Sequence, residues 1–158
     1  MRPYSFSVKA EEKIVWELFI HWIDGKGDNH LIGRLVFITK FTESRFVIEY
    51  FKDCLADAEK YNFERISGCP TDNGKYTWEY PYSYLPIFVE ERMINPNRSD
   101  LMFHLGRYGL DIYDRYEFFK RSHGICSDNF LFLSDKEDDT NYWHNMKHGI
   151  MLGKPKPE

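Results

Sequence analysis

The sequence predicts an α+β fold: a mostly antiparallel sheet of about five or six strands with two main helices packed on it. Several segments alternate apolar and polar residues and are separated by short turns, and one long segment has helical spacing. A regular alternation of strands and helices, which would indicate a parallel sheet, is absent. The 158 residues suit one domain, which we expect over residues 1–150, followed by a flexible C-terminal tail at 151–158.

Three strands are predicted in the first quarter of the chain. In residues 4–8 the apolar side chains of Tyr4, Phe6 and Val8 alternate with polar ones, which is typical of a half-buried strand. The second predicted strand is indicated by large apolar residues at every second position: Ile14, Trp16, Leu18, Ile20 and Trp22. A helix would also fit some of these positions, but we favour the strand. The Asp- and Gly-rich stretch at 24–29 is a turn signal, so residues 31–41 should pair back as a hairpin.

Two amphipathic helices are predicted after the hairpin. Apolar residues recur at three- and four-residue steps through 46–61, and Thr42 or Ser44 can cap this helix. A second helix is expected from Ser99 or Asp100 to about residue 119, with Gly106 and Gly109 inside it as points where it can bend or break. Short strands are expected near 63–67 and 129–133.

An aromatic ring stands at every second position of residues 76–84. The five rings of this aromatic stripe are Tyr76, Trp78, Tyr80, Tyr82 and Tyr84. In an extended chain all five project from one face. Pro81 and Pro86 cannot donate to a ladder, so we expect an edge strand that continues to residue 89, or two extended pieces. The rings either cover the sheet core or form a partly exposed surface that anchors a protein partner.

An acidic loop at 135–139 is the second candidate for partner binding. Its carboxylates belong to Asp135, Glu137, Asp138 and Asp139. Together with a formal net charge of −4, they would steer a cationic partner towards the protein. The alternative interpretation is a loop that is simply solvated.

Two further groups could hold a metal ion. His144 and His148 lie four residues apart, which places both imidazoles on one helical face if the segment is helical. The glutamate of the metalloprotease motif is missing between them, so a surface histidine pair is the alternative. The carboxylates of Asp111, Asp114 and Glu117 could form a metal site or a docking surface, or could pair with basic residues of the same helix.

No motif for catalysis or cofactor binding is present. Phosphate-binding, dinucleotide and nucleophile-elbow patterns are missing, and Cys54, Cys69 and Cys126 are too widely spaced for a zinc site. We therefore expect no cofactor. Only Lys75 adjoins the aromatic stripe, so nucleic-acid binding is not expected. Apolar runs are too short to cross a bilayer and no signal peptide is recognised, so the expected location is cytoplasmic.

Two functions are compatible with these features. The first is a non-catalytic protein-binding domain, in its concrete form a bacterial inhibitor or immunity protein that occludes a toxin or nuclease with a basic surface. The alternative is a small metal-dependent hydrolase or nuclease that uses the His144/His148 pair. The sequence gives no indication of the oligomeric state.

Overall fold

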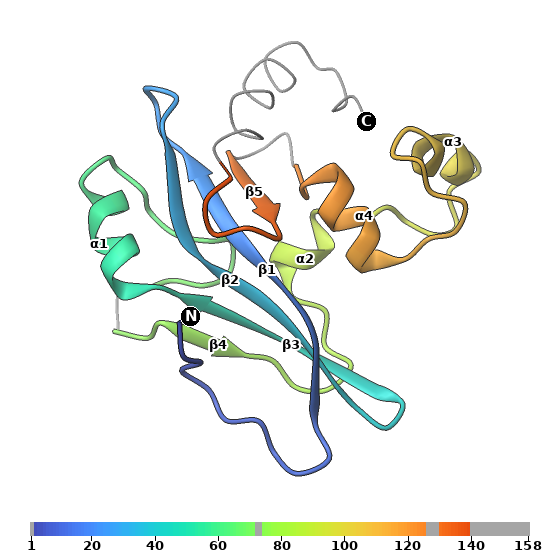
Figure 1. The fold of residues 1–158 in the computed structure, drawn as a ribbon, viewed down its shortest axis with the longest axis horizontal. Helices are drawn as coiled ribbons and strands as arrows, with labels where there is room; N and C mark the ends of the chain where they lie inside the picture. The colour runs from blue at the N-terminus through green and yellow to red at the C-terminus, as the bar shows by residue number, and fades with distance from the viewer. Residues whose placement is uncertain (1, 72–73, 126–129, 140–158) are drawn as a thin grey trace.

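The computed structural model describes residues 2–71, 74–125 and 130–139, and it has the predicted α+β class. Five antiparallel strands form one sheet in the order β4-β3-β2-β1-β5 (Figure 1). The strands are β1 (Lys13–Ile23), β2 (Asn29–Lys40), β3 (Glu43–Tyr50), β4 (Thr77–Glu79) and β5 (Leu131–Ser134). The helices are α1 (Lys52–Glu59), α2 (Ile87–Glu90), α3 (Leu101–Gly106) and α4 (Arg115–Ser122).

The predicted β1–β2 hairpin is confirmed. The turn between the strands is organised by Asp24, whose carboxylate accepts hydrogen bonds from the backbone N–H groups of Lys26 and Asp28 at 2.8 and 2.9 Å. Its second oxygen lies 2.7 Å from Nε2 of His30. A side chain that bonds to the backbone two and four residues later is a common way of closing such a loop.

The helix predicted over residues 46–61 is wrong in its first part. Residues up to Tyr50 belong to β3, which pairs with β2 along its whole length, and α1 begins only at Lys52. All side chains of β3 from Arg45 to Tyr50 are buried. A strand that is covered on both faces loses the alternation of apolar and polar residues, and its apolar run then resembles a buried helix.

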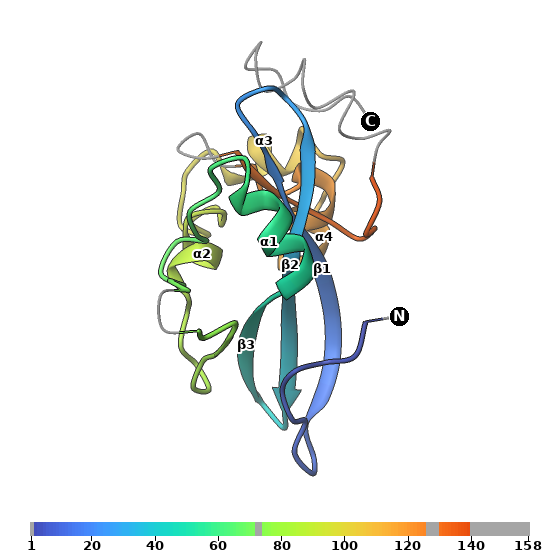
Figure 2. The same ribbon diagram turned by 90° about the vertical axis from the view of Figure 1, so that its left-hand side faces the viewer.

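The sheet is covered on both faces. On one face the main core contains Leu18, Leu35 and Ile48 with residues of α1, α2 and α4. On the other, Phe6 packs with Val36, Ile38 and Val47 in a smaller cluster. Figure 2 shows α2 and the N-terminal segment on opposite sides of the sheet.

The N-terminal segment is not the strand that residues 4–8 predict. It crosses the sheet without joining it, and side chains of the sheet hold its backbone. Arg34 donates to the carbonyl oxygens of Arg2 and Pro3 at 3.2 and 2.8 Å, and Arg45 donates to that of Ser7 at 3.2 Å. Side-chain donors therefore replace the ladder hydrogen bonds of a strand.

Several other predictions are corrected. Residues 87–90 form the helix α2 where a continuing strand was expected, and near 63–67 the structure has only an isolated bridge between Ile66 and Cys69. The second predicted helix is two helices, α3 and α4, because Gly109 adopts a left-handed backbone conformation with φ of 72°. The last strand is confirmed as β5. Among the described helices none is long and apolar enough to cross a membrane.

Candidate functional site

The aromatic stripe does not present five rings on one face. Only residues 77–79 are in a strand, β4 at the edge of the sheet. Tyr76, Trp78 and Tyr80 are partly buried against the main core. The Nζ atom of Lys75 lies 3.9 Å from the ring centroid of Trp78, and that of Lys52 lies 4.9 Å from the centroid of Tyr76. The first three rings therefore pack against the protein's own core and lysines.

The stripe turns at its end, where Ser83 has a φ of 68°. The hydroxyl of Tyr82 donates to the carboxylate of Glu12 in the N-terminal segment. Tyr84 stacks on Tyr80 with ring centroids 5.5 Å apart and an interplanar angle of 5°. Tyr84 is 50% exposed, so it is the ring of the stripe that offers the largest accessible fraction to a partner.

The acidic loop follows β5, at the opposite edge of the sheet from the stripe. Asp135, Glu137 and Asp138 are exposed. Asp139 is buried, and its carboxylate accepts a hydrogen bond of 2.5 Å from the hydroxyl of Ser134. The structure thus separates the two predicted parts of a partner-binding surface and places Asp139 in the interior.

The exposed acidic loop lies beside carboxylates of α1. Arg2 joins them, with Nη1 3.1 Å from Asp53 and Nε 2.9 Å from Glu137. The three carboxylates of Asp53, Asp57 and Glu137 act on one neighbouring group, the thiol of Cys54. Burial raises the pKa of this thiol, the charge of Arg2 opposes the rise, and the three carboxylates add to it. We call Asp53, Asp57 and Glu137 the acidic patch. Helical spacing places Asp53 and Asp57 on the outer face of α1, but nothing local indicates that Glu137 lies near them.

The possible metal ligands are only partly described. His144 and His148 lie outside the described residues. Asp114 is the N-cap of α4 and accepts from the backbone N–H of Glu117 at 3.0 Å. Glu117 forms ion pairs with Lys120 and Arg121 at 3.0 and 3.5 Å. Within residues 2–71, 74–125 and 130–139, no group of three or more His, Cys, Asp or Glu side chains could hold a metal ion.

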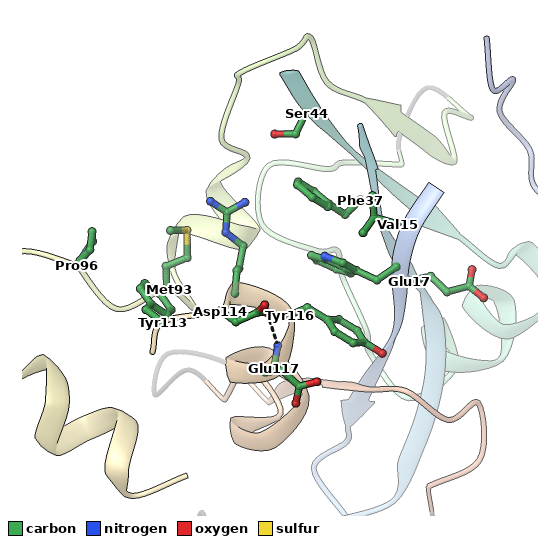
Figure 3. Close-up of a pocket in the computed structure, with 12 residues that line it drawn as sticks. Val15, Glu17, Phe37, Ser44, Met93, Pro96, Tyr113, Asp114, Tyr116 and Glu117 are labelled. Carbon is green, nitrogen blue, oxygen red and sulfur yellow. Dashed lines mark hydrogen bonds between the residues drawn. The ribbon is translucent and has the colours of Figure 1, made fainter. Parts of the chain in front are cut away.

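An open groove of about 900 Å³ lies between the sheet and the N-terminal end of α4. Figure 3 shows Val15 and Phe37 on the side of the sheet, Met93, Tyr113 and Pro96 on the opposite side, and Tyr116 between them. The lining residues are Val15, Trp16, Glu17, Phe37, Ser44, Met93, Pro96, Tyr113, Asp114, Arg115, Tyr116 and Glu117. We call this hollow the α4 groove.

Stacked rings form the wall of the α4 groove on the side of the sheet. The ring of Trp16 stacks on Phe37 at 5.2 Å between centroids, and on Tyr116 at 5.3 Å. A bulge between Ile14 and Trp16 shifts the register of β1, which turns Trp16 onto the main-core face and leaves Val15 half exposed at the rim. Rings that stack on one another in this way form a rigid apolar surface.

Arg115 is the first residue of α4 and lines the same groove. Its guanidinium carbon lies 5.3 Å from the ring centroid of Phe46 and 5.9 Å from that of Phe37. Its Nε atom is buried and has no hydrogen-bond partner among the described residues. Burial lowers the pKa of Arg115. An arginine that is partly desolvated and has no carboxylate partner among the described residues is suited to binding an anion.

No pattern in the sequence indicates the α4 groove. Trp16 and Phe37 were expected as strand residues, and Asp114 and Glu117 as a helical surface, but no signal links residues about 100 positions apart. Comparisons with known proteins add no candidate function: no family model, curated protein or solved structure matches this chain.

Proposed function

We propose that this chain is a non-catalytic protein-binding domain, and specifically an inhibitor or immunity protein that neutralises a toxin or nuclease by occluding it. The observation that carries this proposal is the α4 groove, in which aromatic rings and one arginine line an open hollow together with polar residues. Tyr, Trp and Arg are the residue types that dominate the binding energy of protein interfaces, and they act best when a partner excludes water from them.

An exposed apolar side chain at the α4 groove supports a protein partner. Val15 at the rim is 50% exposed. A partner that covers the groove can also cover Val15. Tyr84 offers a further aromatic contact at the β4 edge of the sheet. Large rings supply contact area with little loss of side-chain entropy.

The acidic patch supports a partner with a basic surface. The side chains of Asp53 and Asp57 are 71% and 73% exposed, and that of Glu137 is 45% exposed. Within the patch Arg2 bridges two of these carboxylates, and Lys60 lies 3.5 Å from Asp57. Exposed charges of this kind chiefly increase the association rate of an oppositely charged partner, and salt weakens their effect.

The decisive experiment uses the products of the genes that adjoin the gene for this chain. Each product is expressed alone and together with this chain, and bacterial growth is measured. We expect one product to arrest growth and this chain to restore it, with a 1:1 complex seen by calorimetry. If no adjoining product arrests growth and none binds with a Kd below about 10 µM, the proposal is wrong.

The proposed role of the acidic patch in attracting a basic partner has its own test. A triple variant, Asp53→Asn/Asp57→Asn/Glu137→Gln, removes three charges from the acidic patch. Its control, Glu11→Gln/Glu43→Gln/Glu90→Gln, removes three exposed charges elsewhere. We expect only the patch variant to bind about tenfold more slowly at low salt and to lose the salt dependence of the association rate. Equal rates for both variants would contradict a role of the patch in steering.

A further inference from the structure

We propose that the α4 groove is a carboxylate-binding site, in which Arg115 holds a carboxylate that lies next to an aromatic ring on a peptide segment of the partner. This inference rests on the proposed function in taking the ligand to be part of a protein. It names the chemistry that the groove recognises, which the proposed function leaves open.

The three acidic residues that line the groove already have partners for their carboxylates. Glu17 accepts from the hydroxyl of Tyr4 at 2.9 Å and lies 3.7 Å from Arg34. Asp114 accepts the backbone N–H at the start of α4. Glu117 pairs with two basic residues of its own helix. None of these three acids forms an ion pair with Arg115 in the described part of the chain.

Arg115 is therefore the charged residue of the groove lining that has no counter-ion among the described residues. Its guanidinium carbon lies 5.9 and 5.3 Å from the ring centroids of Phe37 and Phe46, and its Nε has no acceptor among the described residues. Any partner that covers the groove removes water from this cation. Covering a charge without supplying an acceptor is costly, whereas a carboxylate can accept two parallel hydrogen bonds from the planar guanidinium.

The walls of the groove define what accompanies the carboxylate. Trp16 and Tyr116 stack at an interplanar angle of 28°, and Trp16 and Phe37 at 20°, so Trp16 is stacked with both rings. Planar groups pack well against such a surface. A hollow of about 900 Å³ holds a ring and its neighbouring peptide units. The fitting ligand is thus an aromatic residue that adjoins a chain-terminal or side-chain carboxylate.

The test compares two ligands that differ only in charge. N-acetyl-L-phenylalanine carries the carboxylate, and N-acetyl-L-phenylalaninamide keeps the ring but is neutral. Binding is followed by NMR from the backbone amides of residues 115–117. We expect the acid to bind at least about tenfold more tightly than the amide, as is usual for a hydrogen bond between charged groups. A hexapeptide that ends in phenylalanine, with a free or amidated C-terminus, should show the same preference with higher affinity.

Arg115→Met removes the charge and keeps the length of the side chain. In this variant we expect the acid and the amide to bind within about twofold of each other. Arg107→Met is the matched control, because Arg107 is exposed and does not line the groove, and it should retain the preference. Arg115→Lys keeps the charge but loses the bidentate geometry, so an intermediate preference is expected.

Three results would overturn the carboxylate site: no binding of the acid, equal binding of acid and amide to the unaltered protein, or an unchanged preference in Arg115→Met. The proposed function fails separately. If the acid binds as expected but no protein partner does, the carboxylate site stands and the inhibitor function is wrong. If the acid binds the groove but the hexapeptide with a free C-terminus does not, the ligand is a free small carboxylate and the peptide assignment is wrong.

Discussion

Arg34 and Glu49 form an ion pair inside the protein, between neighbouring strands and beneath the N-terminal segment. They are register partners on β2 and β3, and their side chains are 2% and 3% exposed. The backbone N–H of Ser5 donates to the same carboxylate at 2.6 Å, and the guanidinium carbon of Arg34 lies 4.2 Å from the ring centroid of Tyr4. The pair thus fastens the N-terminal segment to the sheet.

Replacing Arg34 by methionine should destabilise the protein by about 3–5 kcal/mol, because Glu49 is left as a buried charge without its cation. The measurement is urea unfolding at pH 7. The double variant Arg34→Met/Glu49→Leu should recover a large part of this loss, since neither charge then needs a partner. A loss below about 1 kcal/mol in the single variant would show that the buried pair does not fasten the segment.

A second ion pair predicts how stability depends on pH. Arg45 donates to both oxygens of Glu12, at 2.7 and 3.2 Å, and Tyr82 donates as well. These bonds lower the pKa of Glu12 from 4.5 to about 2. The carboxylate therefore stabilises the fold fully above pH 4.5, and this contribution is lost as the pH falls towards 2.

In Glu12→Gln this pH-dependent contribution is absent. We expect the variant to be less stable than the unaltered protein by about 2 kcal/mol at pH 6, and the difference to shrink steadily between pH 5 and pH 2. Urea unfolding at several pH values measures it. Glu11→Gln, which alters the neighbouring exposed acid, is the control. A difference that stays constant over this range would contradict the ion pair as its source.

The two stacked tyrosines should behave differently on truncation. Tyr80 packs against the main core and its hydroxyl lies 3.1 Å from Sγ of Cys69, while Tyr84 is half exposed. Burial raises the pKa of Tyr80. We expect Tyr80→Ala to cost about 3 kcal/mol and Tyr84→Ala less than about 1 kcal/mol. Thermal and urea unfolding distinguish them, and equal losses would contradict the burial difference.

Gly33 should not tolerate a side chain. It lies on β2 opposite Tyr50, and an added Cβ would collide with the carbonyl oxygen of Glu49 and lie 3.0 Å from Cα of Tyr50. Because backbone cannot move aside without parting β2 from β3, Gly33→Ala should cost about 3 kcal/mol or more. Gly25→Ala is the control, since a Cβ there meets nothing within 4 Å. Circular dichroism melting curves measure both variants.

The sequence predicts those parts of the fold whose signals are local. The alternation in residues 14–22 and the turn at 24–29 are enough for the first hairpin, because the strands that pair are joined directly by that turn. For residues 46–50 the local pattern wrongly predicts a helix, since both faces of β3 are covered and apolar residues no longer alternate with polar ones. Helical spacing over residues 46–61 would place Glu49 on the polar outer face of a helix, whereas in the structure it is buried against Arg34.

In the aromatic stripe, too, the local pattern predicts the backbone conformation but not the position of each ring. Its alternation correctly indicates an extended backbone for residues 77–79. It cannot show that Ser83 reverses the chain and that Tyr82 turns to Glu12. That turn depends on the N-terminal segment, which crosses the other face of the sheet. The rings therefore separate into three that pack on the core (Tyr76, Trp78 and Tyr80), Tyr82 on Glu12, and the half-exposed Tyr84.

By itself, then, the sequence determined the α+β class, the first hairpin, the last strand and the acidic character of the chain. Only the tertiary structure decided which face each aromatic ring occupies, which acids are buried, and that β1, β2 and α4 meet around Arg115. The physical reason is that periodicity records the burial of each residue relative to its immediate neighbours. A groove, or a counter-ion that is missing from it, depends on contacts between residues far apart in the chain.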